Sequence, residues 1–152
     1  MTPDDWRGIK NFSPRENWGD AYRMDLGLVR LLDAFRSYLN LPIVVLCGTQ
    51  GSHTANSQHY LGRAVDILIP APIHPLDLIL TAERFNFTGL GYYPEWSFQN
   101  HVWGGLHLDV REVKSVEPES RWLGLRDPKT GSNRYIGLTR ENLKRYCAPG
   151  LF

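Results

Sequence analysis

Residues 57–69 read SQHYLGRAVDILI and combine a histidine-bearing loop with a short buried strand. His59 lies in a polar stretch, Gly62 permits a turn, and the apolar run over residues 64–69 is typical of a strand. Side chains alternate along a strand, so Asp66 faces the opposite side from its two apolar neighbours. A carboxylate inside such a run is costly to bury unless it is paired or bound to a cation. This stretch therefore predicts a sheet with an ionic partner on one of its faces.

A second segment, residues 106–111 (LHLDVR), repeats this pattern. Its alternation predicts a strand with His107 and Asp109 on one face and apolar side chains on the other. Two separate strands would thus each present ligand-type side chains among hydrophobic neighbours.

These side chains have two interpretations. Two imidazoles and one carboxylate, with a fourth position open to water, form a common catalytic zinc site. Alternatively, Asp66 and Asp109 pair with Arg63 and Arg111 as ordinary salt bridges at the ends of strands. The residues alone favour the metal without excluding the salt bridges.

The remaining sequence predicts a single domain over residues 1–152. Its fold class is α+β, with a small central antiparallel sheet, helices packed on one side and the ligand cluster on the sheet face. Aromatic residues within 1–19 indicate an ordered arm that packs on the domain. The expected elements are a helix over 20–40 capped by Asp20, a strand over 43–47, a loop over 48–58, strands over 64–69 and 106–111, a helix over 75–87, a strand or turn over 89–93, a turn over 129–132 and a short helix over 139–146.

Composition excludes several classes of function. The net charge of +1 gives no general electrostatic reason to expect nucleic acid or an anionic membrane as a partner. Two cysteines do not make a disulfide framework, so we expect a buried small side chain at Cys47 and a free thiol at Cys147. No segment has the apolar length of a signal peptide or a membrane span, so we expect a chain made in the cytoplasm that does not insert into a membrane.

The pattern S-x-H-x-x-G-x-A-x-D over 57–66, followed by H-x-D over 107–109, resembles the zinc D-alanyl-D-alanine carboxypeptidase and murein endopeptidase family. That family is similar to the vancomycin-resistance dipeptidases and to the hedgehog amino-terminal domain. The likeness includes LVRLL over 28–32, GLGYYP over 89–94 and the Arg-Trp pair at 121–122.

This resemblance implies that His59, Asp66 and His107 bind one Zn²⁺ ion. It also implies a peptidase that cuts bacterial peptidoglycan stem peptides, as a carboxypeptidase or an endopeptidase. A phage or prophage lysis protein, made without a signal peptide and acting on the cell wall after release, fits these expectations. A monomer is favoured. The alternative is an inactive protein of the same fold that binds zinc and serves in wall docking or in a phage particle.

Three residues are candidates for substrate contacts. Many members of the family carry an arginine after the first strand, where this chain has Gln50. A glutamine amide could donate a hydrogen bond to a developing oxyanion, although more weakly than a cation. Arg63 could take over that role, and Ser57 opens the motif.

The general base is also uncertain from sequence. Dipeptidase-type members have a carboxylate three residues before the last ligand, where this chain has Gly104. Asp109 is the nearest carboxylate on the ligand face and is our candidate for the catalytic base, although it could equally orient an imidazole. Glu95 and His101 are further candidates. His53, in the polar loop, either lines the cleft or is solvated.

Overall fold

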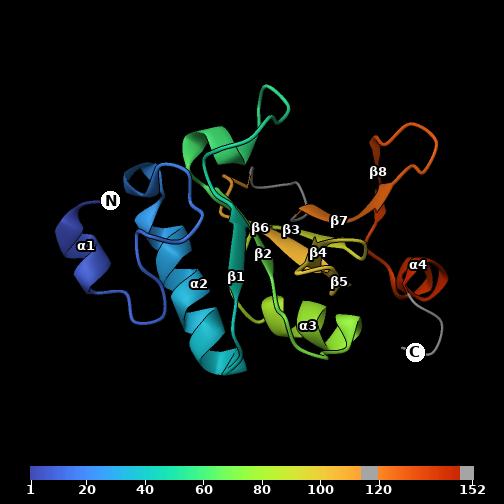
Figure 1. Ribbon diagram of the computed structural model, residues 1–152, viewed down its shortest axis with the longest axis horizontal. Coiled ribbons are helices and arrows are strands. Elements are labelled where there is room, and N and C mark those ends of the chain that lie inside the picture. Colours follow the sequence, from blue (N-terminus) through green and yellow to red (C-terminus); the bar gives the residue numbers. More distant parts are fainter. Residues whose placement is uncertain (114–119, 148–152) are drawn as a thin grey trace.

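The computed structural model describes residues 1–113 and 120–147, and its elements are shown in Figure 1. The helices and 3₁₀ turns are α1 (Pro3–Arg7), η1 (Ala21–Arg23), α2 (Leu26–Leu39), η2 (Gln58–Leu61), α3 (Pro75–Ala82) and α4 (Arg140–Tyr146). The strands are β1 (Val44–Cys47), β2 (Ala64–Leu68), β3 (Gly89–Tyr93), β4 (Ser97–Phe98), β5 (His101–Val102), β6 (Gly105–Asp109), β7 (Ser120–Arg126) and β8 (Asn133–Gly137).

The main sheet has the strand order β1-β2-β6-β3-β7-β8, and β4 and β5 form a separate hairpin. Neighbouring strands are antiparallel except for β3 and β7, which run parallel. The α+β class is therefore confirmed, with a mixed sheet rather than a wholly antiparallel one. Strand β6 lies between β2 and β3, so both of its edges are hydrogen-bonded.

The two faces of the sheet differ in character. On one face, apolar side chains of the strands pack with α2 and α3 in a single core; the strand residues include Val65, Ile67, Leu90, Leu106, Leu108, Leu123 and Leu125. The other face carries Asp66 and His107, which are paired across β2 and β6. Alternation along each strand thus separates the core from the polar cluster.

Helix α2 begins later than the sequence suggested. Asp20 caps only the 3₁₀ turn, and Asp25 caps α2 by accepting a hydrogen bond from the Leu28 backbone N–H. Met24 between them is extended. Asn40 ends the helix in the left-handed conformation, as the predicted stop at residue 40 requires. Helix α3 ends at Ala82, earlier than the predicted residue 87. Phe85 and Phe87, which follow it, pack against Phe35 of α2.

The N-terminal arm is ordered, as expected: its tryptophan rings, Trp6 and Trp18, are buried and lie 5.5 Å apart. The strand pair β7 and β8 and the hairpin β4–β5 were not predicted. Within the described residues, no helix combines the length and the apolar character that crossing a bilayer requires.

Candidate metal centre

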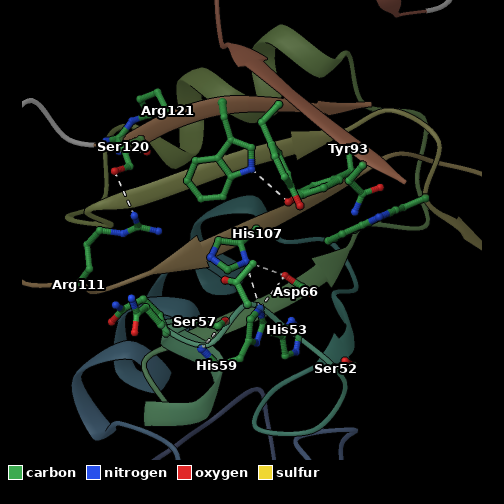
Figure 2. Close-up of a pocket in the computed structure, with 17 residues that line it drawn as sticks. Ser52, His53, Ser57, His59, Asp66, Tyr93, His107, Arg111, Ser120 and Arg121 are labelled. Atoms are coloured by element: carbon green, nitrogen blue, oxygen red, sulfur yellow. Dashed lines mark hydrogen bonds and ion pairs between the residues drawn. The ribbon is translucent and has the colours of Figure 1, made fainter. Parts of the chain in front are cut away.

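Three side chains bring one donor atom each to a single point on the polar face of the sheet (Figure 2). His59 Nε2 lies 3.2 Å from His107 Nδ1 and 3.3 Å from Asp66 Oδ1. His107 Nδ1 lies 2.8 Å from the same Asp66 oxygen. Around a tetrahedral zinc ion with bonds of about 2.0–2.1 Å, two donors are separated by about 3.3 Å. The two distances from His59 are close to that value, and the distance between His107 and Asp66 is shorter, at hydrogen-bond length, so the cluster has nearly the size of a metal site.

The tautomer of each histidine is fixed by the hydrogen bond at its other nitrogen. His59 Nδ1 lies 2.7 Å from the Gly48 carbonyl oxygen, which can only accept, so this nitrogen carries the proton. His107 Nε2 lies 3.1 Å from the Asp109 carboxylate and likewise donates to it. When both rings are neutral, their remaining nitrogens turn lone pairs toward each other and toward Asp66. Three facing donors repel one another unless protons or a cation lie between them.

The pKa values of the three side chains show that the site favours positive charge between them. Burial alone would lower the pKa of His59, but its hydrogen bonds with Asp66 and Cys47 outweigh burial and raise the pKa to about 9. Burial also acts to lower the pKa of His107, and its hydrogen bonds with Asp109 and Asp66 raise it to about 9. Burial would raise the pKa of Asp66, yet hydrogen bonds with both histidines bring it down to about 2. A bound cation would supply the same charge while leaving both imidazoles neutral.

The loop that carries His59 is built by local capping. Ser57 accepts a hydrogen bond from the His59 backbone N–H, which starts η2. Gly62 ends η2 in the left-handed conformation, where a side chain would also collide with the Arg23 backbone. These two residues are the first and sixth of the S-x-H-x-x-G pattern. Together they place the His59 ring over the polar face of the sheet, beside Asp66 and His107.

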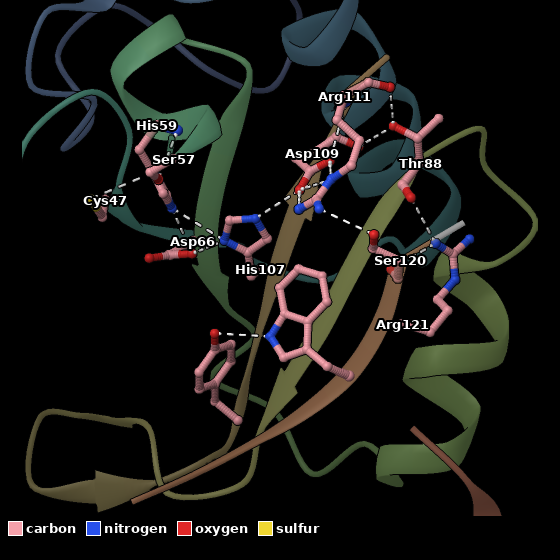
Figure 3. Close-up of polar contacts among 12 residues, drawn as sticks. Cys47, Ser57, His59, Asp66, Thr88, His107, Asp109, Arg111, Ser120 and Arg121 are labelled. Atoms are coloured by element: carbon pink, nitrogen blue, oxygen red, sulfur yellow. Dashed lines mark hydrogen bonds and ion pairs between the residues drawn. The ribbon is translucent and has the colours of Figure 1, made fainter. Parts of the chain in front are cut away.

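His107 donates a hydrogen bond to the buried carboxylate of an ion pair formed by Asp109 and Arg111 (Figure 3). Asp109 is fully buried and accepts from His107 on one side and from the Arg111 guanidinium on the other. Burial would raise the pKa of Asp109, but these hydrogen bonds keep it well below its usual range. Gly89 on the neighbouring strand leaves room for the carboxylate, since a methyl group there would overlap it.

A tryptophan covers the other side of His107. The Trp122 ring lies 5.1 Å from the His107 ring, and its indole N–H donates to the Tyr93 hydroxyl over 3.1 Å. Gly91 of β3 makes space for this indole, because a side chain at that position would collide with it. The repeated glycines of the GLGYY segment thus admit the two side chains that position the ligand histidine.

The cluster lies at the floor of an open cleft of about 1010 Å³. One wall comes from the loop before η2 and includes His53 and Ser57, and the opposite wall is aromatic. Arg111 and Ser120 lie at one end, and Tyr93 lies at the other (Figure 2). The aromatic wall consists of Tyr93, Trp96, Trp122 and Tyr135. A peptide-sized molecule can therefore reach the three donors.

The structure brings some of the sequence-predicted residues together and leaves others out. His59, Asp66 and His107 meet, and Ser57 lines the cleft beside them. Asp109 is enclosed behind His107, so its geometry favours the role of an orienting acceptor over that of the general base.

Two predicted substrate contacts lie outside the cleft. The Gln50 amide donates to the backbone and side-chain oxygens of Asn17 and accepts from the Gly48 N–H, so it fixes the loop instead of facing the cluster. Arg63 pairs with Glu112 on the surface. Nothing in the sequence indicated that Asn17, in the N-terminal arm, would accept the hydrogen bonds of the Gln50 amide.

Sequence reasoning missed Trp122 and Tyr135 as parts of the aromatic wall. The salt-bridge interpretation did pair Asp109 with Arg111, as the structure has it, but missed that Arg111 lines the cleft. The sequence analysis used Trp122 only as half of the Arg-Trp pair at 121–122. Its position beside Gly91 depends on the pairing of β3 with β7, which was not predicted. For Arg111, the alternating strand pattern was a usable signal, because residues 107, 109 and 111 fall on one side. His53 does line the cleft, with its ring stacked on His59 at 4.1 Å.

Comparison of the chain with models of known protein families, with curated proteins and with solved structures gave no match.

Proposed function

We propose that this protein is a zinc-dependent peptidase that hydrolyses peptide bonds in bacterial peptidoglycan stem peptides. The observation that carries the proposal is the convergence of two tautomer-fixed imidazoles and one carboxylate at the floor of an open cleft. Such a set leaves a coordination position free for a reactant, as catalytic zinc sites do.

Zinc, when bound, supplies Lewis-acid activation of water and of a carbonyl group. The chain supplies the rest. Gly48 and Asp109 keep the protons of His59 and His107 on the nitrogens that face away from the cluster. Trp122 shields one side of His107 from water, which strengthens the electrostatic interactions of the site.

Glu95 is our candidate for the general base. It lies in a smaller hollow of about 370 Å³ that it shares with Asp66 and Trp96, both of which also line the main cleft. Its carboxylate is exposed and has room to turn toward a substrate. In this role it accepts a proton at a side-chain oxygen and returns it to the leaving amine. Glu95→Gln should keep the bound metal and lose roughly 10²- to 10⁴-fold in turnover. Glu112→Gln, outside the cleft, is the matched control.

The substrate class follows from the resemblance, and the cleft is compatible with it. Its aromatic wall offers flat apolar surface for a stem peptide or for attached sugar rings, while Asn133 and Ser57 offer hydrogen bonds. Carboxypeptidase and endopeptidase action are both open to such a cleft. We further propose that the protein acts as a monomer, after release to the cell wall, in a phage or prophage system.

One observation favours the inactive alternative, a wall-docking or particle protein that binds zinc. Among the described residues that line the main cleft, Asp66 is the one carboxylate, and it belongs to the metal cluster. If Glu95 does not act as a base, the cleft would bind stem peptides without cutting them.

The test is turbidity loss of purified cell walls with the zinc-loaded protein, with chelator-treated protein and with zinc restored. We expect lysis that the chelator abolishes and zinc restores. Mass spectrometry of the released muropeptides then identifies the bond. His107→Ala should lose zinc and lysis together. His101, which the sequence offered as a candidate base, is exposed on the β4–β5 hairpin and does not line the cleft, so His101→Ala should lose neither. Zinc retention by the His107→Ala protein would contradict the proposed ligand set, and wall binding without release would favour the docking protein.

A further inference from the structure

A second group of donor atoms lies behind His59, in the loop that follows β1. Cys47 Sγ is 3.6 Å from His53 Nε2. The Gln50 carbonyl oxygen is 3.0 Å from that sulfur and 2.9 Å from that nitrogen. Thiol, imidazole and carbonyl thus converge within a few residues of chain, beside His59 and opposite Asp66 on the neighbouring strand.

The separation of the sulfur and the nitrogen fits coordination, whereas the two distances to the carbonyl oxygen are those of hydrogen bonds. With a zinc–sulfur bond of about 2.3 Å and a zinc–nitrogen bond of about 2.0 Å, a tetrahedral ion holds sulfur and nitrogen about 3.6 Å apart. That is the distance between Cys47 Sγ and His53 Nε2. A thiolate with an imidazole selects Zn²⁺ or the softer Cd²⁺ over Mg²⁺ and Ca²⁺.

The His53 ring is fixed before any ion arrives. Its backbone N–H donates to the Tyr60 hydroxyl over 2.9 Å, and the same hydroxyl donates to the His53 carbonyl over 3.1 Å. The ring stacks on His59 with an interplanar angle of 7°. Gly51 has a φ of +94°, which allows the tight turn that returns His53 toward the sulfur. His53 also lines the cleft, so an ion can enter from solvent.

We propose that Cys47 and His53 form a second cation site, for Zn²⁺ or Cd²⁺, with the Gln50 carbonyl as a third donor. In the metal-free protein the Gln50 carbonyl accepts hydrogen bonds from the Cys47 thiol and from His53 Nε2. Binding releases the thiol proton of Cys47 to solvent, and His53 changes tautomer by losing the Nε2 proton to solvent and taking one up at Nδ1, which frees the Nε2 lone pair. His59 Nδ1, 4.0 Å from the sulfur, keeps its proton on the Gly48 carbonyl and serves the first cluster alone. The two sites therefore share no ligand atom.

The experiment is a Cd²⁺ titration of the reduced full chain, followed by total metal analysis and by the ultraviolet thiolate-to-cadmium absorption. We expect two equivalents, one of which produces the absorption. Cys47→Ser should lose the absorption and one equivalent. Cys147→Ser should keep both, since that thiol is buried elsewhere and burial raises its pKa to about 11. His53→Gln should lower the Cd²⁺ affinity of the absorbing site. Loss of a residue that only orients a ligand costs roughly 10- to 100-fold in affinity, and loss of a ligand should cost at least as much.

The two sites fail separately. His107→Ala should remove the silent equivalent and keep the absorption. One absorbing equivalent in the wild type would support the second site and count against the proposed zinc peptidase. A wild type without thiolate absorption, or a Cys47→Ser protein that keeps it, would overturn the second site and leave the peptidase untouched.

Discussion

The two donor clusters meet at His59 but are built in different ways. Asp66 and His107 belong to paired strands in the middle of the sheet, where register places them directly opposite each other. Cys47 and His53 lie six residues apart and are arranged by a turn, a tyrosine hydroxyl and a stacked ring. Long-range pairing holds the first cluster, and local contacts hold the second.

This difference predicts how each cluster responds to change. A donor on a strand can move only if the sheet moves, so the sheet cluster should tolerate alterations in the loops. The loop cluster is held by fewer contacts and is more exposed, so its metal affinity should be more sensitive to substitution.

Asp66→Ala should abolish metal binding at the sheet cluster, because it removes the one anionic ligand and leaves two imidazoles facing each other. We expect complete loss of wall lysis and a lower melting temperature in the presence of zinc. Metal that binds only the native state at 1,000 times its dissociation constant contributes about 4.1 kcal/mol, which this variant forgoes. The loop cluster should keep its Cd²⁺ absorption; loss of both would show that the clusters are not independent.

Asp109→Asn should weaken zinc binding by roughly 10- to 100-fold, because the amide no longer holds the His107 proton as strongly. It also leaves the partly exposed Arg111 guanidinium with a neutral amide in place of a carboxylate, which should lower the free energy of unfolding by about 1.5–3 kcal/mol. Competition with a chelator measures the first effect, and urea unfolding of the metal-free protein measures the second. Unchanged zinc affinity would remove Asp109 from its positioning role.

Gly91→Ala should destabilise the protein by about 1–3 kcal/mol, since the added methyl group collides with Trp122. The displaced indole should press on His107 and weaken zinc binding, while the loop cluster is unaffected. Gly137→Ala is the matched control, because its nearest neighbour would lie at an ordinary 3.8 Å. Equal stability of the two variants in urea would contradict the close packing inferred for β3.

Tyr60→Phe should have the smallest effect and should act on the loop alone. It removes the hydroxyl that contacts the His53 backbone twice, worth about 0.5–1.5 kcal/mol per hydrogen bond. We expect weaker Cd²⁺ absorption and normal zinc content at the sheet cluster. Tyr38→Phe removes a hydroxyl bonded to Arg84 far from either cluster and should change neither.

The same contrast explains what could be predicted from the sequence. Alternation in residues 64–69 and 106–111 places Asp66 and His107 on one face, because a strand has only two. The pairing of β3 with β7 could not be predicted, since a parallel neighbour leaves no local signal and Trp122 gains its place only from that register. Gln50 was misplaced for a similar reason, because its partner Asn17 is 33 residues away.

The central place of β6 also bears on the order of events during folding. Asp66 and His107 are 41 residues apart, so the cluster is complete only after β6 has docked between its neighbours. A long loop must close before that contact forms, which is a slow step. Zinc should then hardly speed refolding and should mainly retard unfolding, leaving the amides of β6 among the last in the chain to exchange with solvent deuterium.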